Sequence, residues 1–388
     1  MALEKDFEFV SSDRIIFGNG CIVKVKEAAQ DFGRKALLVC GSGSVPLDNL
    51  VNILKEGEIT FEIFRVENEP DISGIDAGIS KAKSTGCTFV IGYGGGSVMD
   101  SAKAISAMMT NPGVLMDYLE VIGGGRKIVN SPAPMIAIPT TAGTGTEVTR
   151  NAVIASSEHN VKVSMRSPLM VPRVAIVDPE LTITMPPSVT ASTGMDALTQ
   201  VIEGFVSNKA NPMTDALAKE GIINGSRALL RAYQNGRDLQ ARYDMSLTSL
   251  FGGLVLGNSG LGAVHGFAGP IGGMFHAPHG VICASLLPSV MKYNALEISN
   301  RAGMEAIQKK FNEIGQWVTG KPDASVEDGI AWIEDLAKKL EIPGLREIGI
   351  KKSNFASIIE KASVASSMQK NPVKLDTETL KLILEAAY

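Results

Sequence analysis

The sequence is poor in cysteine and histidine, with only four residues of each among 388. No two cysteines have CxxC spacing, and four are too few for a disulfide framework in a chain of this length. We therefore expect reduced cysteines in the core of a cytoplasmic protein. The four are Cys21, Cys40, Cys87 and Cys283.

Other features that would define a class of protein are also missing. Acidic and basic residues are interspersed and the net charge is −4, so no basic stripe is available to bind a phosphate backbone. Residues 1–10 carry charged side chains and lack the apolar segment of a secretory signal. No stretch reaches the roughly 18 consecutive apolar residues of a membrane-spanning helix. We expect neither nucleic acid nor a membrane as a partner.

The length and the hydrophobic pattern predict two domains, because 388 residues exceed what one core usually supports. Up to residue 185, short apolar runs alternate with amphipathic helical segments, which is typical of a mostly parallel sheet covered by helices. From residue 186 to residue 388, long helical patterns follow one another. We predict an α/β domain over 1–185 and an all-helical domain over 186–388.

The segments behind this division are short apolar runs and longer periodic ones. The runs that predict strands are 35–40, 61–66, 88–93, 135–138 and 174–177. The patterns that predict the main helices are 47–56, 72–85, 190–207, 212–234, 243–258, 302–319, 326–340 and 377–387.

Three polar loops follow predicted strands. Residues 94–103, GGGSVMDSAK, come after one strand and open a helix, while GSGS at 41–44 and TTAGTGTE at 140–147 follow two others. Glycines let backbone N–H groups approach a phosphate closely, and ligands of open α/β sheets bind at the carboxyl ends of strands. The loops predict a phosphate-bearing cofactor. Ser97 and Asp100 have the alternative interpretation of a helix capping box.

Three of the four histidines lie between Gly260 and Gly280. They are His265, His276 and His279. Imidazole is the commonest neutral metal ligand and titrates near physiological pH, so the concentration indicates a metal or proton-transfer site. The alternative is local clustering of histidines in a helix and loop.

Asp196 and Gln200 are four residues apart in a predicted helix, which places both on one face. A carboxylate, an amide oxygen and two or three imidazoles brought together could hold iron(II) or zinc(II). The alternative for Asp196 is a carboxylate near a helix N-terminus, where the helix dipole favours it.

Several of these motifs together resemble one family, the iron-containing (group III) alcohol dehydrogenases. The motifs are TASTGMDALTQVIEGFVS, GGGSVMDSAK, PTTAGTGTEVTRNAVI, VDPELT and VHGFAGPIGGMFHAPHG, and they span most of residues 5–295. The resemblance implies a dehydroquinate synthase-like architecture, in which an N-terminal α/β domain binds NAD(P) and a C-terminal helical domain binds the metal. The active site is then expected between the two domains.

The resemblance assigns Asp196, His265 and His279 as metal ligands. It places Gln200 where the family usually has a fourth ligand, a histidine, and iron(II) is expected ahead of zinc(II). Gly269 stands where many members have a further histidine for proton relay. We therefore expect that role to pass to His276, a water or a cofactor hydroxyl.

The resemblance also implies positions around the cofactor. Asn151 lines the site near the nicotinamide, and Lys162 has the alternative of a solvated charge. Members that favour NADH often have an aspartate where this chain has Gly41, so NADPH is admissible here. The expected cofactor-binding residues are Gly41, Gly95, Gly96, Ser97, Asp100, Thr140, Thr141, Thr144 and Lys162.

The activity implied is metal-assisted, reversible hydride transfer between NAD(P)(H) and a small alcohol or aldehyde, in a homodimer. Two alternatives stay open. One is another metal enzyme of the same architecture, similar to dehydroquinate synthase or glycerol dehydrogenase. The other is a cofactor-binding protein whose metal site has degenerated at Gln200 and Gly269.

Overall fold

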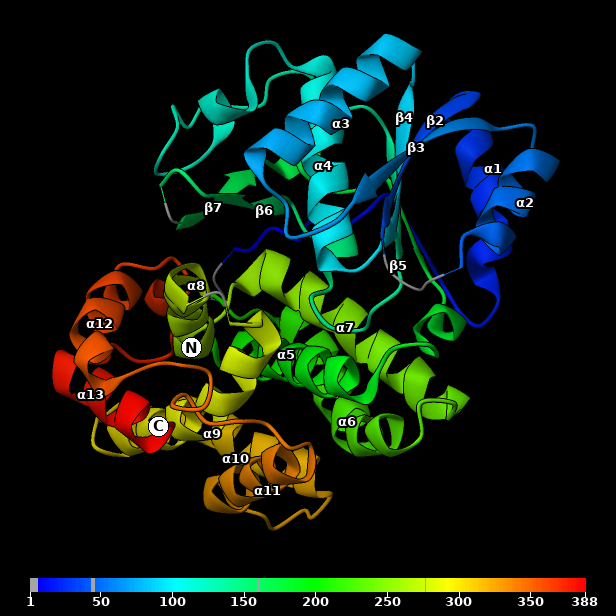
Figure 1. Cartoon of the computed structure of the whole chain (residues 1–388). Coiled ribbons are helices and arrows are strands. Elements are labelled where there is room, and N and C mark those ends of the chain that lie inside the picture. Colours follow the sequence, from blue (N-terminus) through cyan, green and yellow to red (C-terminus); the bar gives the residue numbers. More distant parts are fainter. Residues whose placement is uncertain (1–5, 43–45, 160, 276) are drawn as a thin grey trace. The chain divides into compact units, whose positions relative to one another are not determined.

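A computed structural model shows the arrangement of the chain (Figure 1). It describes residues 6–42, 46–159, 161–275 and 277–388. Within these residues no single helix is both long and apolar enough to cross a membrane, although the bent pair Leu239–Ser259 and Ala263–Phe275 meets the length and composition criteria together.

The chain forms two compact units. The sheet unit contains Ser12–Pro186 together with Asn235–Ser246, and the helical unit contains Pro187–Gln234 and Leu247–Tyr388 with the described residues before Ser12. Arg242 ties the separate segment into the sheet unit, because its guanidinium donates to the carbonyls of Gly236 (2.9 Å) and Met185 (3.3 Å).

The sheet unit is built on a six-stranded sheet in the order β1-β8-β5-β4-β2-β3, in which every neighbouring pair is parallel. The prediction of a mostly parallel sheet is confirmed. The strands are β1 (Arg14–Phe17), β2 (Lys35–Gly41), β3 (Thr60–Val66), β4 (Phe89–Gly94), β5 (Met135–Pro139) and β8 (Val174–Val177).

Helices cover both faces of this sheet (Figure 1). Leu37 and Val39 of β2 are buried in one core and Ala36 and Leu38 in the other, because successive side chains of a strand point to opposite faces. Both faces are apolar, as expected of a buried parallel sheet. The helices α1 (Val25–Gln30) and α2 (Asp48–Glu56) supply one core, and α3 (Ile72–Thr85) and α4 (Gly96–Thr110) supply the other.

A hairpin that the sequence analysis did not name joins the second core. Strands β6 (Asn151–Ser156) and β7 (Val161–Arg166) pair antiparallel. Ala152, Ile154 and Val163 are buried while their neighbours are more exposed, which is the alternation of a sheet with one covered face.

The helical unit contains only helices among its described elements. They are α5 (Pro187–Val206), α6 (Pro212–Gln234), the later part of α7 (Leu239–Ser259), α8 (Ala263–Phe275), α9 (His279–Ser299), α10 (Glu305–Thr319), α11 (Val326–Lys339), α12 (Phe355–Ser363) and α13 (Thr377–Ala386).

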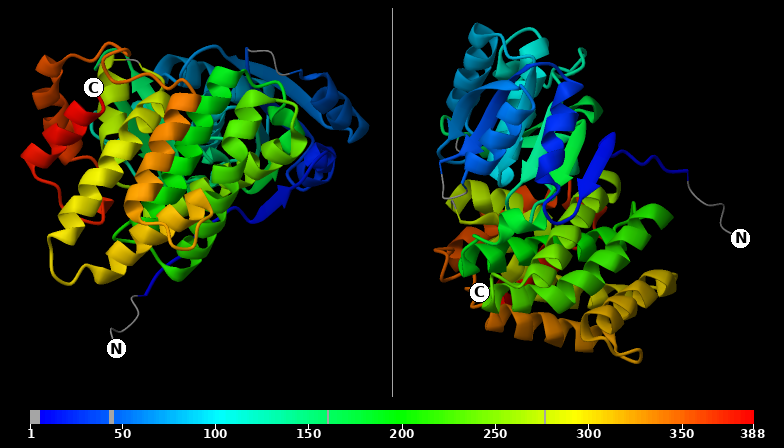
Figure 2. Two further views of the ribbon diagram at one scale, coloured as in Figure 1. Left: turned by 90° about the horizontal axis from the view of Figure 1, so that it is seen from below. Right: turned by 90° about the vertical axis from the view of Figure 1, so that its right-hand side faces the viewer.

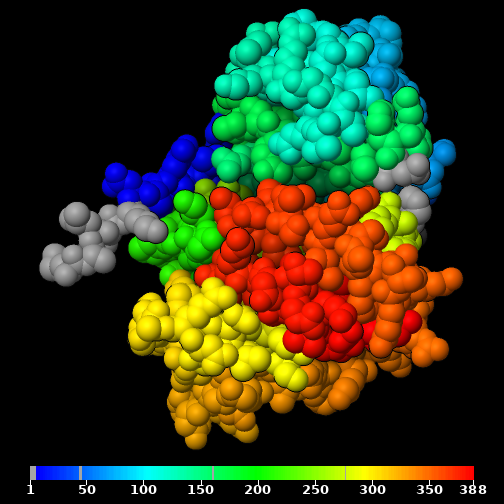
Figure 3. Space-filling view, turned by 90° about the vertical axis from the view of Figure 1, so that its left-hand side faces the viewer, coloured from blue at the N-terminus to red at the C-terminus, as the bar shows by residue number. Residues whose placement is uncertain are grey.

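Helix α9 packs against α5, α8, α10, α11 and α13. Its residues, drawn in yellow, form a long helix of this unit (Figure 2). The C-terminal helices, drawn in orange and red, cover one face of the unit in the space-filling view (Figure 3). Side chains at the start of α9 are therefore held by a helix that packs against five others.

Candidate functional site: a nucleotide crevice and a cluster of metal-ligating side chains

A small cavity opens at the carboxyl edge of the parallel sheet. From β2 the chain goes to β3 on one side and then to β4 on the other, so the carboxyl ends of β2 and β4 flank a topological switch point, where α/β sheets bind ligands. The cavity has a volume of about 160 Å³. It is lined by Cys40, Gly41, Leu47, Tyr93, Gly94, Gly95, Val98 and Thr140.

Two glycines bring the second and third polar loops together. A Cβ atom added to Gly95 would lie 3.3 Å from the side chain of Thr141, and one added to Gly96 would lie 3.3 Å from that of Thr144. The structure thus gathers Gly41, Gly95 and Thr140 around the cavity and packs the two threonines beside the glycine turn. Gly43 and Ser44 of the first loop lie outside the described residues.

The N-terminus of α4 points free N–H groups toward this edge. The N-cap is Gly95, and no side chain caps the helix. The capping-box interpretation of Ser97 and Asp100 is wrong, because the helix begins at Gly96 and the Asp100 carboxylate accepts from Thr146 Oγ1 (2.7 Å) and Val153 N (3.0 Å) instead. Uncapped N–H groups at a helix start suit a phosphate.

Lys103, one turn further along α4, is fully buried. Its ammonium donates to Thr146 O (3.0 Å), Thr146 Oγ1 (2.6 Å), Thr149 Oγ1 (3.0 Å) and the carbonyl of Asn151, and it lies 3.3 Å from Asp100 Oδ1. Burial lowers the pKa of Lys103, although the Asp100 carboxylate opposes that shift. We call Asp100, Lys103, Thr146, Glu147 and Thr149 the lysine cluster.

Glu147 of this cluster is a buried acid. Burial raises its pKa from 4.5 to about 7, against the smaller opposing effects of its own backbone N–H and of Lys103. The lysine cluster joins α4 to the start of the hairpin, because Lys103 donates to the Asn151 carbonyl and Asp100 accepts from the Val153 N–H.

Asn151 and Lys162 lie on the hairpin. The Asn151 carbonyl accepts from Lys103, which fixes the backbone at the start of β6. Lys162 on β7 pairs with Glu69 at 2.6 Å, and only 20% of its side chain is exposed. It is an ion-paired side chain, which is a more ordered position than that of a freely solvated charge.

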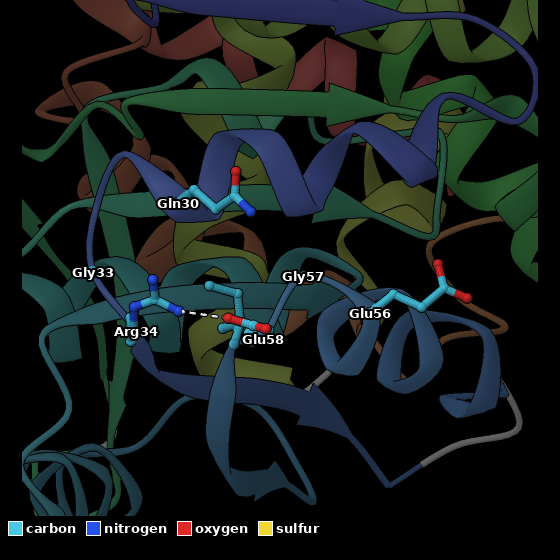
Figure 4. A pocket seen from close by; sticks show the side chains of 7 residues that line it. Gln30, Gly33, Arg34, Glu56, Gly57 and Glu58 are labelled. Carbon is cyan, nitrogen blue, oxygen red and sulfur yellow. Dashed lines mark hydrogen bonds and ion pairs between the residues drawn. The ribbon is translucent and has the colours of Figure 1, made fainter.

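A second hollow lies at the opposite, amino edge of the sheet (Figure 4). Its volume is about 450 Å³, and it is lined by residues just before β2 and β3. The Arg34–Glu58 ion pair (3.0 Å) crosses it, and about four fifths of each side chain is exposed. Because α/β sheets bind nucleotides at the carboxyl ends of strands, the smaller cavity has the position of a nucleotide site and this hollow does not.

Four ligand atoms converge in the helical unit. Asp196 on α5, His265 on α8, and His279 and Cys283 on α9 each offer one atom, and these atoms lie within 4.8 Å of one another. Asp196 Oδ1 is 3.2 Å from His265 Nε2 and 3.7 Å from His279 Nε2. Donors about 2.0–2.3 Å from one tetrahedral ion lie about 3.3–3.7 Å apart, so the residues fit a divalent cation. We call these four residues the ligand cluster.

Glu203, which the sequence analysis missed, orients His265. Its carboxylate lies 2.7 Å from His265 Nδ1 and accepts from the Val264 N–H (2.6 Å), so it holds both the imidazole and the start of α8. A carboxylate behind a ligating imidazole fixes the ring and its tautomer. Glu203 follows Asp196 by seven residues on the same helix face, and that spacing could have found it.

Gln200 contacts the ligand cluster through its nitrogen. Its Nε2 donates to Asp196 Oδ2 (3.2 Å), while its Oε1 is buried without a hydrogen-bond partner. A Cβ atom added to Gly252 of α7 would lie 2.8 Å from that oxygen, so the oxygen faces the neighbouring helix. The amide therefore supports the carboxylate.

The charges of the ligand cluster outweigh burial. Burial would raise the pKa of Asp196, yet attraction to His279 and a hydrogen bond from His265 lower it. Burial would lower the pKa of His265, yet Cys283, Asp196 and Glu203 raise it well above its ordinary value. Cys283 also raises the pKa of His279. A cation would take the place of the imidazole protons, because ligating imidazoles are neutral.

Two positions concern the predicted proton relay, His276 and Gly269. His276 lies outside the described residues. Gly269 is on α8, one turn after His265, and a Cβ atom added there would have no neighbour within 4 Å. The space beside it is therefore open.

A parallel sheet with a glycine-lined cavity at its switch point, and a helical unit with converging carboxylate, imidazole and thiol donors, define a nucleotide-dependent metal oxidoreductase. Comparison with known proteins narrows this class. Residues 12–179 match the family described as iron-containing alcohol dehydrogenase, and residues 190–388 match the C-terminal part of that family. The chain belongs to the iron-containing alcohol dehydrogenase family.

Individual relatives agree along the whole chain. Alcohol dehydrogenase 4 of Saccharomyces cerevisiae is 34% identical over 96% of this chain and 96% of its own. The 1,3-propanediol dehydrogenase of Klebsiella pneumoniae is 35% identical over 98% of this chain and 99% of its own. A solved structure of 1,3-propanediol oxidoreductase has a TM-score of 0.92 at 34% identity and covers 99% of this chain and 100% of that chain. This chain is an oxidoreductase that acts on alcohols or aldehydes.

Proposed function

We propose that the protein transfers hydride reversibly between a nicotinamide cofactor, held by the glycine turn of the sheet unit, and a small alcohol or aldehyde whose oxygen is held at the ligand cluster. The observation that carries the proposal is the convergence of Asp196, His265 and His279 on one point. Such convergence also supports an enzyme over a cofactor-binding protein with a degenerate metal site.

A divalent cation would polarise the substrate oxygen, and a nicotinamide would accept or donate the hydride. The chain would hold and orient both groups. Asp196, His265 and His279 would bind the cation, and Glu203 keeps the His265 ring in place. Alcohol oxidation releases the hydroxyl proton, and His276 stays the predicted relay for it.

In the sheet unit we assign the diphosphate to Gly95, Gly96 and Ser97, whose backbone lies at the uncapped start of α4. Thr140, Thr141 and Thr144 supply hydroxyl donors beside this turn. Asn151 faces the nicotinamide from a backbone position that Lys103 fixes. Gly41 borders the adenosine end of the cavity.

The roles of Lys162 and Asp100 have less direct support than those of the residues around the glycine turn. We place Lys162 near the cofactor only through the family resemblance, because its ammonium is paired with Glu69. Asp100 acts indirectly, by holding the loop that carries Thr146. A homodimeric assembly and a cytoplasmic location stay predictions.

We propose NADPH as the preferred cofactor. At the end of β2, Gly41 presents no carboxylate, and Arg65 on the neighbouring strand donates to the Gly41 carbonyl (3.2 Å). An arginine beside the adenosine ribose suits a 2′-phosphate. In the variant Arg65→Ala we expect the KM for NADPH to rise about 10-fold, the effect of losing one charge-assisted contact, and the KM for NADH to stay constant. An equal change for both cofactors would contradict the preference.

The activity itself is tested by turnover of the purified protein. Protein loaded separately with iron(II) and with zinc(II) is mixed with NADPH or NADH and a panel of small aldehydes, and the loss of cofactor absorbance is followed. We expect oxidation of NADPH with at least one loaded form. If neither cofactor is oxidised in either form, the proposed function is wrong.

A further inference from the structure

Cys283 lies at the point where the other ligand atoms meet. It follows His279 by one turn of α9, and its Sγ is 3.6 Å from His279 Nε2 and 3.8 Å from His265 Nε2. The thiol is buried and unpaired with another cysteine. Ligand atoms that share a tetrahedral ion lie about 3.3–3.7 Å apart. The two sulfur–nitrogen distances agree with this range to within about 0.1 Å.

Gln200 does not occupy that point. Its amide nitrogen faces the Asp196 carboxylate, and its oxygen is directed at Gly252. A ligating amide would have to present the oxygen, since a protonated amide nitrogen has no lone pair to offer a cation. With Gln200 in this orientation, the Cys283 sulfur is the atom in position to be the fourth ligand.

We propose that the Cys283 thiolate is the fourth protein ligand of the cation and that Gln200 is a positioning residue for Asp196. This proposal rests on the proposed function only in that both place a cation at the ligand cluster. On binding, the thiol proton leaves to solvent and the sulfur lone pair forms the new bond, so no oxidant or reductant is needed.

The donor set of this site then differs from one made of oxygen and nitrogen alone. Thiolate is a soft ligand that favours zinc(II), and zinc(II) also binds N, O and S sites more tightly than iron(II). The structure thus favours zinc(II) over the iron(II) expected from the sequence. Four protein ligands still admit a substrate oxygen, because zinc sites expand to five ligands. His279, whose side chain is 46% exposed, marks the accessible side.

Cobalt(II) reports directly on sulfur ligation. Apo-protein titrated with cobalt(II) is expected to develop the near-ultraviolet thiolate-to-cobalt charge-transfer band at one equivalent. In the variant Cys283→Ser the band is expected to vanish, and the zinc(II) affinity to fall more than about 100-fold, beyond the 10–100-fold typical of an outer partner. The variant Gln200→Ala should keep the band, with an affinity loss of about 10–100-fold.

Cys87→Ser is the matched control, because Cys87 is a buried cysteine of the sheet unit; its band and affinity should equal those of the unmodified protein. Far-ultraviolet circular dichroism of each variant verifies the fold. The proposal is overturned if the unmodified protein binds cobalt(II) without the sulfur band, or if the band persists in Cys283→Ser. A sulfur band without turnover would uphold the ligand and defeat the proposed function; turnover without the band would do the reverse.

Discussion

Two buried polar clusters, one in each unit, differ in where their atoms point. In the lysine cluster, the Lys103 ammonium has an oxygen partner in every direction in which it can donate. In the ligand cluster, the ligand atoms of Asp196, His265, His279 and Cys283 converge on one point, and a proton on His265 joins its ring to the Asp196 carboxylate. The first arrangement is complete, whereas the second needs a proton or a cation to be stable.

The difference indicates that the lysine cluster stabilises the fold and that the ligand cluster binds a ligand. A buried ionisable group that its neighbours satisfy joins elements of the fold, and removing it leaves the others unpaired. Buried metal-ligating atoms that converge on a common point lower the free energy of unfolding unless a proton or a cation binds between them. Geometry distinguishes the two clusters, although both contain charged residues that are almost fully buried.

The largest expected effect is on zinc(II) affinity, and it comes from a substitution in the ligand cluster, at Asp196. In Asp196→Asn, the loss of the carboxylate charge between the imidazoles should lower zinc(II) affinity about 1000-fold or more, above the 10–100-fold of an outer partner. Competition with a zinc chelator measures the affinity, and Asp215→Asn, which breaks only the Lys310 ion pair in the same unit, is the control. Equal affinities in the two variants would contradict the assignment.

The opposite response is expected at Lys103. In Lys103→Met, the Asp100 carboxylate and several oxygens lose their buried partner, so the free energy of unfolding should fall by about 3–5 kcal/mol. Zinc(II) affinity of the folded protein should be unchanged. Urea denaturation gives the first quantity. Lys81→Met, which removes one bond to the Ile63 carbonyl, should cost far less. A loss no larger than that of Lys81→Met would make the lysine cluster energetically unimportant.

The lysine cluster should also make the free energy of unfolding depend on pH, through Glu147. The pKa of Glu147 is raised from 4.5 to about 7, so folding favours its protonated form. The resulting stabilisation is complete below pH 4.5 and is lost as the pH rises through about 7. Relative to Glu147→Gln, we expect the unmodified protein to lose up to about 3 kcal/mol over this range.

Denaturation of both proteins in urea from about pH 5 to pH 8 measures this difference. Glu58→Gln, which replaces an exposed glutamate of the same unit, is the control. A constant difference between the unmodified protein and Glu147→Gln at all pH values would show that Glu147 does not titrate there.

The smallest effect is expected at Glu203. In Glu203→Gln, the His265 ring keeps a neighbour but loses its charged acceptor, so zinc(II) affinity should fall about 10–100-fold. The loss should be smaller than in Asp196→Asn. Calorimetric titration measures it, with Glu220→Gln on the exposed side of α6 as control. A loss as large as that of Asp196→Asn would make Glu203 a ligand.

Much of the fold was predictable from the sequence because periodicity reflects burial. Helix α3 was predicted with its observed bounds, Ile72–Thr85, and its ends have local signals: Asp71 caps the first turn and Gly86 adopts φ 70° after the last. Helices α8 and α9 lie in the region predicted to be all-helical, but their individual bounds were not predicted. Their stretch is rich in glycine and contains Pro270 and Pro288, which disfavour helix in isolation, and packing within the unit overrides that tendency.

The site was predictable where residues of one type cluster in the sequence and missed where a residue stands alone. Three of the four histidines lie within residues 260–280, so His265 and His279 were conspicuous. Cys283 was interpreted as a core residue because free cysteine usually behaves as a small apolar side chain. Its role depends on α9 bringing it one turn from His279, and the bounds of that helix were not predicted. The amide orientation of Gln200 depends on contacts with α7, which no local pattern encodes.

The path of the chain between the two units has a consequence for biosynthesis. Residues 235–246 are separated from the rest of the sheet unit by α5 and α6, yet they supply Arg242 to the Met185 carbonyl and Tyr243 to the ring of Phe17. A ribosome must therefore deliver two helices of the other unit before the sheet unit is complete. A gene fragment that ends at residue 186 would lack these contacts, so transplanting the nucleotide-binding half into another protein requires the later segment as well.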